Sequence, residues 1–350
     1  MNKKLKVAIV GFGWFGKQHF KVYENLSNVE VVAICDINVN NIDKEKSLQD
    51  EFHKDVAKED VFDFQNIKIY NDITELLLNE NIDLIDVVSI ESEHYNLAKR
   101  ALLSGKNVII EKPMTISYSD AKELYDIAIE NKLVFYVGNI LRFDDRYRAL
   151  NDLIKEKNKD DIRHLSLERN FQSKSHYVYG RVNPAYSACI HDIDLTLWLS
   201  KSNVKSVYAY GSHFLNRENP DVIICILELE NGAVSVIQNV WHINDNCPYG
   251  FEFSTKIILD DGTYMIRNEP IIHCWTKNGV EYPELFFWPT IDGAIQGCLL
   301  KELGHYVDCA LNNIESNILP MKEAIESIKI ANAIEISLNE KTKIYLKEVR

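Results

Sequence analysis

One apolar run of the chain ends in a charged pair and a proline. Val108-Ile109-Ile110 follows Gly105-Lys106-Asn107 and leads into Glu111, Lys112 and Pro113. Proline has no N–H and restricts the preceding residue to extended geometry, so Lys112 should lie at the end of a strand. In an open α/β sheet, ligands bind beyond the carboxyl ends of the strands. Lys112 is therefore either an acid/base group or a solvated charge at a strand end.

A second chemical pattern is a glycine-rich turn near the N-terminus. Gly11-Phe12-Gly13-Trp14-Phe15-Gly16 follows a strand-like segment, 5–10, and precedes a helix-like segment that reaches Leu26. Glycines in a strand–turn–helix context permit a tight turn and let a pyrophosphate approach the helix N-terminus. The pattern predicts a dinucleotide cradle.

An acidic residue follows where a dinucleotide-binding unit needs one. Asp36 comes after the second predicted strand, 29–34, twenty positions beyond Gly16. A carboxylate there accepts hydrogen bonds from ribose hydroxyls and repels a 2′-phosphate. Ile37-Asn38 offers no arginine to bind such a phosphate. The sequence therefore predicts NAD, in preference to NADP.

Alternating strands and helices position these residues up to about residue 140. Further strands are predicted at 67–70, 84–89, 108–110 and 133–137, and helices at 73–78, 92–103 and 117–130. The charged, partly amphipathic segment 39–65 indicates a helix and a loop. Strand–helix alternation is typical of a doubly wound parallel sheet. Residues 1–140 are therefore predicted to form an α/β dinucleotide-binding domain.

The pattern changes beyond residue 140, where strands predominate. They are predicted at 163–170, 204–210, 222–230, 233–242, 252–259, 263–266 and 271–275, with helices at 185–199, 295–311 and 321–338. Residues 141–350 are thus predicted to form an α+β domain for substrate binding and oligomerisation, on an open, mainly antiparallel sheet, and the late helices can pack back on the first domain. Because an open sheet face needs cover, we expect a homodimer or homotetramer formed through it.

Composition limits the classes of function. The 350 residues carry 39 Lys+Arg and 52 Asp+Glu, a net charge of -13, which argues against nucleic acid or an anionic membrane as the main partner. No apolar run approaches the ~18 residues of a membrane span. The seven cysteines include no C-x-x-C, as expected of reduced thiols. These features predict a cytoplasmic protein with a sizeable core.

The motifs together resemble those of a known family. The glycine-rich turn, Asp36, Glu111-Lys112-Pro113, Asn139–Phe143 and His191-Asp192-Ile193-Asp194 occur in the order typical of the glucose–fructose oxidoreductase/inositol dehydrogenase/MocA family. The resemblance extends to the late segment 302–306. It implies a Rossmann domain followed by an open-faced α+β domain. It also implies NAD(P)-linked hydride transfer at a secondary carbinol of a cyclitol or sugar, of the inositol type or nucleotide-linked.

The resemblance also implies roles for particular residues. Lys112 would bond the reacting hydroxyl and His191 would lie beside the substrate, so both are predicted to be catalytic. Burial and a nearby NAD⁺ charge would lower the pKa of Lys112, whereas Glu111 would oppose them. The predicted cofactor contacts are Gly11, Phe12, Gly13, Trp14, Phe15, Gly16, Asp36, Ser89, Glu91, His94, Glu111 and Lys112. The predicted substrate contacts are Lys112, Asn139, Arg142, Tyr177, Ser187 and His191.

The sequence departs from the family in the segment before His94 and in the segment before His191. Ser89-Ile90-Glu91 replaces the usual Thr-Pro-Asn before His94. Ser187 stands where members often carry an aspartate, four residues and one helical turn before His191. A serine can orient an imidazole but brings no charge. We therefore expect His191 to position the substrate and Lys112 to carry the proton.

Other functions stay open at this point. The same fold suits a reductase, an enzyme that recycles a tightly held cofactor, or a non-catalytic NAD-binding sensor or assembly subunit; intact Lys112 and His191 favour an enzyme. His191 beside Asp192 can also be a structural, hydrogen-bonded histidine. A metal site at His191, Asp192 and Asp194 is not predicted, because no further ligand pair accompanies them and lysine-assisted hydride transfer needs no metal.

Overall fold

The computed structural model divides the chain into two compact units. It describes residues 4–38, 62, 64–79, 81–215, 217–247, 250–277 and 279–349. The first unit is Met1–Thr115, Ser119–Phe143 and Glu284–Met321, and the second is Ile116–Tyr118, Asp144–Pro283 and Lys322–Arg350. The chain thus passes between the units after Phe143, near the domain boundary expected at 140, and segment 284–321 belongs with the first unit. The helix and loop expected at 39–65 lie almost wholly outside the described residues.

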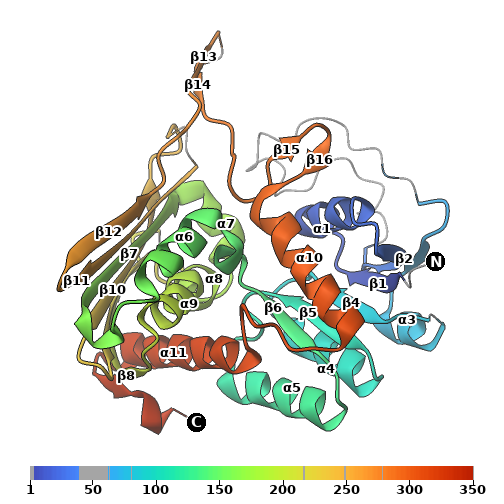
Figure 1. The fold of residues 1–350 in the computed structure, drawn as a ribbon, viewed down its shortest axis with the longest axis horizontal. Coiled ribbons are helices and arrows are strands. Elements are labelled where there is room, and N and C mark those ends of the chain that lie inside the picture. The colour runs from blue at the N-terminus through green and yellow to red at the C-terminus, as the bar shows by residue number, and fades with distance from the viewer. Residues whose placement is uncertain are drawn as a thin grey trace. The chain divides into compact units, whose positions relative to one another are not determined.

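A parallel sheet forms the centre of the first unit (Figure 1). Its order is β3-β2-β1-β4-β5-β6, and all five pairings are parallel. The strands are β1 (Leu5–Val10), β2 (Val29–Cys35), β3 (Lys68–Tyr70), β4 (Leu84–Val87), β5 (Asn107–Glu111) and β6 (Phe135–Gly138). Apolar runs make the central strands because helices cover both faces of such a sheet. The predicted doubly wound sheet is confirmed, and its order reverses between β1 and β4, the switch point at which such sheets bind ligands.

Five helices of the described part of the chain accompany this sheet: α1 (Trp14–Glu24), α3 (Ile73–Asn79), α4 (His94–Leu103), α5 (Tyr118–Glu130) and α10 (Gly297–Asn312). Helix α10 comes from the late part of the chain, yet it contacts α1. Its Tyr306 hydroxyl donates to the carbonyl of Val137 at 2.7 Å, and its ring stacks on Tyr136 with centroids 4.8 Å apart. The late helix is therefore anchored at the end of β6.

The second unit is built on a seven-stranded sheet of order β12-β11-β7-β10-β9-β8-β17. Its strands are β7 (Ile162–Gln172), β8 (Val204–Ser212), β9 (Val222–Leu229), β10 (Val234–Ile243), β11 (Phe251–Leu259), β12 (Gly262–Arg267) and β17 (Ile344–Tyr345). Only the β7–β10 pairing is parallel, so the prediction of a mainly antiparallel sheet is confirmed. One face packs against α6 (Asp145–Ile154), α9 (Cys189–Ser200) and α11 (Met321–Glu340) (Figure 1).

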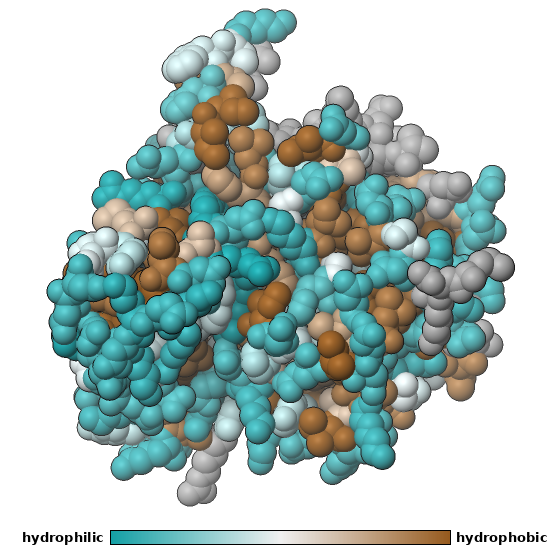
Figure 2. Space-filling model, in the orientation of Figure 1, coloured by the Kyte–Doolittle hydropathy of each residue, from teal (hydrophilic) through white to brown (hydrophobic). Residues whose placement is uncertain are grey.

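The strand expected at 271–275 is wrong in extent and in partner. Only β13 (Cys274–Thr276) forms there, and it pairs with β14 (Gly279–Glu281) as a separate hairpin outside the large sheet. Pro270 explains the difference, because a residue without an N–H cannot continue the ladder of β12. Hydrophobic side chains remain visible in the region of this hairpin (Figure 2), where Ile271 and Trp275 are exposed. A second small hairpin, β15 (Thr290–Ile291) with β16 (Ala294–Ile295), was not expected.

The other face of the large sheet presents an apolar patch. Tyr208 pairs with Ile226 across β8 and β9, and Tyr210 pairs with Ile224. Each of these four side chains is more than 40% exposed. Contiguous apolar patches of this kind mark interaction surfaces. We propose that a second copy of the chain covers this face.

Ile226→Glu tests that proposal at the middle of the patch. The substitution would bury a carboxylate between the two copies, opposite the same carboxylate of the second copy, and so weaken the oligomer. Light scattering should therefore report a smaller particle than for the unmodified protein. Leu153→Glu is the matched control, because Leu153 is exposed on α6, away from this face. A monomeric unmodified protein, or equal masses for both variants, would contradict the proposal.

Candidate functional site

The glycine-rich turn has the backbone geometry of a dinucleotide cradle. Gly11 has φ +96°, and a Cβ there would lie 2.6 Å from the carbonyl oxygen of Val88. A Cβ on Gly16 would lie 2.2 Å from the carbonyl oxygen of Gly11, so α1 packs closely on the turn. Gly13 has no atom within 4 Å of its Cβ position, and it caps α1 without a side-chain hydrogen bond. A tight turn, an open approach and a helix N-terminus without a side-chain cap fit a pyrophosphate.

The aromatic residues within this turn are used by the protein itself. Phe12 is fully buried and packs edge-on against Phe20 at 5.8 Å. Trp14 is also buried; it stacks on Phe15 and meets Trp288 edge-on. Phe12 and Trp14 would therefore meet a cofactor through their backbone rather than through their rings.

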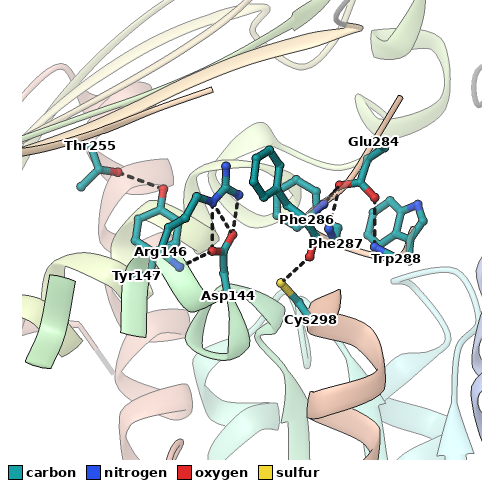
Figure 3. Close-up of polar contacts among 9 residues, drawn as sticks. All are labelled: Asp144, Arg146, Tyr147, Thr255, Glu284, Phe286, Phe287, Trp288 and Cys298. Carbon is teal, nitrogen blue, oxygen red and sulfur yellow. Dashed lines mark hydrogen bonds and ion pairs between the residues drawn. The ribbon is translucent and has the colours of Figure 1, made fainter. Parts of the chain in front are cut away.

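A late loop supports these aromatic contacts. The carboxylate of Glu284 accepts the backbone N–H groups of Phe286, Phe287 and Trp288 at 2.5, 2.7 and 3.0 Å (Figure 3). Cys298, at the start of α10, donates its thiol to the carbonyl of Phe286 at 3.0 Å. Local sequence patterns could not predict this contact, because the loop lies more than 260 positions after the turn that it packs against.

Asp36 lies directly at the glycine-rich turn. Its Oδ2 accepts the backbone N–H of Phe12 at 2.8 Å, and its Oδ1 accepts that of Asn38 at 2.9 Å. A carboxylate offers about four acceptor positions, so it can bind ribose hydroxyls as well as backbone N–H groups. The contact with Phe12 fixes the acid relative to the cradle, which the sequence spacing alone did not predict.

The Glu-Lys-Pro segment begins where β5 ends, as expected. The Lys112–Pro113 peptide is cis, and the backbone N–H of Lys112 donates to Oε2 of Glu111 at 3.1 Å. A Cβ on Gly138 would lie 2.3 Å from Oε1 of Glu111, so a larger residue at position 138 would displace this carboxylate. The carboxylate of Glu111 thus packs against Gly138 at the end of the neighbouring strand β6.

His94 joins the loops that follow β4 and β5. Its Nδ1 lies 2.7 Å from the carbonyl oxygen of Pro113, and its Nε2 lies 3.0 Å from that of Ser89. Burial lowers the pKa of His94, and the two carbonyl contacts oppose that effect only in part. A neutral imidazole donates from one nitrogen, and the shorter contact favours Pro113 as the acceptor. Ser89, His94 and Pro113 are therefore brought together, while Glu91 is buried nearby in sequence.

Two predicted substrate residues of the first unit differ in what they contact. Arg142 is buried, and its guanidinium donates to the carbonyl of Ile318 at 2.9 Å, which gives it an anchoring role. Asn139 is also buried, and its side-chain oxygen has no hydrogen-bond partner among the described residues. A buried oxygen without a hydrogen-bond partner is suited to accept a hydrogen bond from a ligand.

In the second unit, His191 lies in the first turn of α9, the second of two consecutive helices. The helix expected at 185–199 is in fact α8 (Pro184–Ser187) and α9, separated at Ala188, whose φ and ψ are -123° and -57°. The N–H of His191 donates to the carbonyl of Ala188. Ser187 and His191 are therefore not one turn apart on a single helix, and that expectation is wrong. Asn183 caps α8 and Pro184 occupies its first turn, and together they start a separate short helix that the apolar pattern did not reveal.

Helix α9 is held to the sheet by a buried ion pair. Oδ2 and Oδ1 of Asp192 accept from Nε and Nη2 of Arg169 at 3.1 and 2.9 Å. Both side chains are buried. The neighbouring His191 is half-buried and points in a different direction along the helix. Tyr177 is 68% exposed, and the guanidinium of Arg217 lies 3.6 Å from its ring centroid, so its predicted substrate contact stays a prediction.

A doubly wound sheet with this cradle and an acid after its second strand defines a dinucleotide-binding Rossmann unit that suits NAD. Residues 5–139 match the model of an oxidoreductase family with an NAD-binding Rossmann fold, and residues 147–265 match the GFO/IDH/MocA C-terminal domain. The chain belongs to the glucose–fructose oxidoreductase/inositol dehydrogenase/MocA family.

Three similar proteins illustrate this kinship. The inositol 2-dehydrogenase of Salmonella typhimurium is 25% identical over 264 residues, 74% of this chain and 72% of that protein. The scyllo-inositol dehydrogenase from Lactobacillus casei, solved with NAD(H) and scyllo-inositol, has a TM-score of 0.78 at 19% identity, over 99% of this chain and 100% of that one. GenD2 from gentamicin A biosynthesis, solved with NAD, has a TM-score of 0.81 at 18% identity, over 99% of this chain and 97% of that one. At such identities the two structures support the fold.

The described residues lack two features that would point to other functions. They contain no helix long and apolar enough to cross a membrane. They also contain no group of three or more His, Cys, Asp or Glu side chains arranged to hold a metal ion. All seven cysteines are described, and none of them forms a disulfide.

Proposed function

We propose that the protein is an NAD-dependent dehydrogenase that acts on a secondary hydroxyl of a cyclitol or sugar. The observation that carries the proposal is Lys112, at the carboxyl end of β5 in a sheet that also bears the dinucleotide cradle. The curated relatives named as inositol dehydrogenases support the substrate class. Cytoplasmic location and an inositol-type substrate are parts of this proposal.

Lys112 would move the proton in this reaction. When bound, the nicotinamide accepts or supplies the hydride. Oxidation of a carbinol also requires loss of the hydroxyl proton, so a base must lie within hydrogen-bond reach of it. A neutral Lys112 would take that proton, and the ammonium would return it in the reduction direction. Asn139, whose buried oxygen has bonding capacity left, would orient the substrate hydroxyls from the adjacent strand end.

A substrate panel tests the proposal. The protein is incubated with NAD⁺ and myo-inositol, scyllo-inositol, aldoses or UDP-sugars, and NADH formation is followed at its absorbance maximum. Turnover with a cyclitol or free sugar is the expected result. If only the nucleotide-linked sugars react, the proposed substrate class changes from a free cyclitol or sugar to a nucleotide-linked sugar. Tight NAD binding without turnover in either direction would favour a sensor or assembly subunit.

Cofactor preference follows from Asp36. We expect NAD to bind more tightly than NADP, because this carboxylate repels a 2′-phosphate, and we expect Asp36→Ala to narrow the difference. Asp126→Ala is the matched control, since Asp126 is exposed on α5. Fluorescence titration of both nucleotides measures the two affinities. Equal affinities in the unmodified protein would rule out the ribose contact.

His191 is expected to position the substrate. A contact made equally in the ground and transition states changes KM rather than kcat. His191→Asn should therefore raise KM more than it lowers kcat. His213→Asn, in an exposed loop, is the control. A collapse of kcat together with loss of a histidine limb from the pH profile would instead make His191 the acid/base group.

A further inference from the structure

Several ionisable side chains are buried behind the Glu-Lys-Pro segment. His19 on α1 is fully buried, and its Nδ1 lies 2.8 Å from Oδ2 of Asp86 on β4. The hydroxyl of Tyr23 donates to the same oxygen at 2.8 Å. The other ring nitrogen, Nε2, lies 3.6 Å from Oε1 of Glu111. His19 thus lies between a carboxylate in the centre of the sheet and the carboxylate next to Lys112.

The carboxylates near both ring nitrogens of this histidine favour its protonated form. Burial acts to lower the pKa of His19, but the charge of Asp86 and its hydrogen bond outweigh burial, with a smaller effect from Glu111. The pKa is raised to about 10. The edge of the imidazole also meets the ring of Phe15, in the glycine-rich turn, with centroids 4.8 Å apart. The buried cation is therefore in contact with the cradle as well as with Glu111.

Glu111 has little freedom in this arrangement. Its Oε1 lies above Gly138, where no Cβ would fit, and its Oε2 accepts the backbone N–H of Lys112. The imidazolium faces it from α1. Sequence adjacency suggests that Glu111 opposes deprotonation of Lys112, but a cation within ion-pair distance offsets the carboxylate charge.

We propose that His19, held by Asp86, is a positioning residue that fixes Glu111 and balances its charge, and so sets the backbone position and the proton affinity of Lys112. This inference rests on the proposed function, in which Lys112 moves the proton. Neither Asp86 nor His19 needs to touch substrate or cofactor. Their effect passes through the Glu111 carboxylate, one residue before the lysine.

The charges near Lys112 determine whether its pKa rises or falls when His19 is replaced. Asp86 and Glu111 act on His19; Asp86, Glu111 and Glu302 also act on Tyr23, and Glu91 and Glu111 act on His94. Loss of the imidazolium leaves Asp86 and Glu111 without the cation that lies between them. Excess negative charge favours the ammonium form of Lys112, so its pKa must rise.

His19→Gln tests this inference through the pH profile of kcat/KM for oxidation. The limb assigned to Lys112 should move to higher pH by about one unit, so that activity falls about tenfold near neutral pH and recovers in alkali. NAD affinity should change little. His19→Lys restores a cation and should move the limb back. A limb that stays in place in His19→Gln, with only a lower melting temperature, would reduce His19 to a structural role and overturn the proposal.

A second measurement covers the case in which His19→Gln does not fold. In the unmodified protein labelled with ¹⁵N-histidine, the ring nitrogens of His19 should keep imidazolium shifts from pH 6 to pH 9. A neutral imidazole at pH 7.5 would overturn the inference. This readout needs no turnover, so it can fail independently of the substrate panel. If Lys112→Ala stays active, the proposed function fails instead, whatever the charge on His19.

Discussion

Lys112→Ala should lower turnover about 10²–10⁴-fold, the usual cost of losing a general acid/base group. NAD affinity should stay close to that of the unmodified protein, because the glycine-rich turn and Asp36 hold the dinucleotide without this side chain. The loss should appear equally in kcat and kcat/KM, since proton transfer occurs only in the transition state. Single-turnover NADH formation and an NAD titration measure the two quantities separately.

The control for this variant is Lys122→Ala. Lys122 is exposed on α5, so its removal tests the loss of a lysine without touching the strand end. Lys112→Arg adds information, because arginine keeps the charge but cannot give up a proton at these pH values. It should be as inactive as the alanine variant. Turnover within a few-fold of the unmodified protein in a folded Lys112→Ala would remove the lysine from the mechanism.

Local sequence patterns were sufficient for the nucleotide half of the site. The turn from Gly11 to Gly16, the acid Asp36 and the strand end before Lys112 are each defined by neighbours within a few residues. The backbone requirements of a tight turn and of proline act at that range. The parallel sheet followed because strand–helix alternation leaves few other topologies.

Contacts between distant segments could not be predicted in this way. Asp86 interrupts the apolar run 84–88, and a charge inside a buried strand signals a partner without naming it. His19 is 67 positions away, and only the parallel pairing of β1 with β4 brings its helix alongside. The break at Ala188 was hidden for another reason, since the residues on both sides are apolar enough to extend one helix.

Breaking the buried ion pair of Arg169 and Asp192 should have the second large effect, on the stability of the fold. Arg169→Met should lower the free energy of unfolding by about 3–5 kcal/mol, because it leaves a fully buried carboxylate without its bidentate partner. The double variant Arg169→Met/Asp192→Leu should recover much of that loss, since both charges are gone. Urea unfolding followed by tryptophan fluorescence measures these differences.

The pH dependence separates this explanation from simple loss of packing. Burial raises the pKa of Asp192, and Arg169 acts against that rise. In Arg169→Met the pKa must therefore rise further above the unfolded value of about 3.9. An acid whose pKa is higher in the folded state binds a proton on folding, so the destabilisation should grow as pH increases through that raised pKa and shrink toward pH 4. Asp192→Asn removes the titrating acid and leaves a guanidinium that stays charged throughout, so its destabilisation relative to the unmodified protein should not grow over this window. The same pH response in both variants would show that the ion pair does not determine how firmly α9, and with it His191, is held to the sheet.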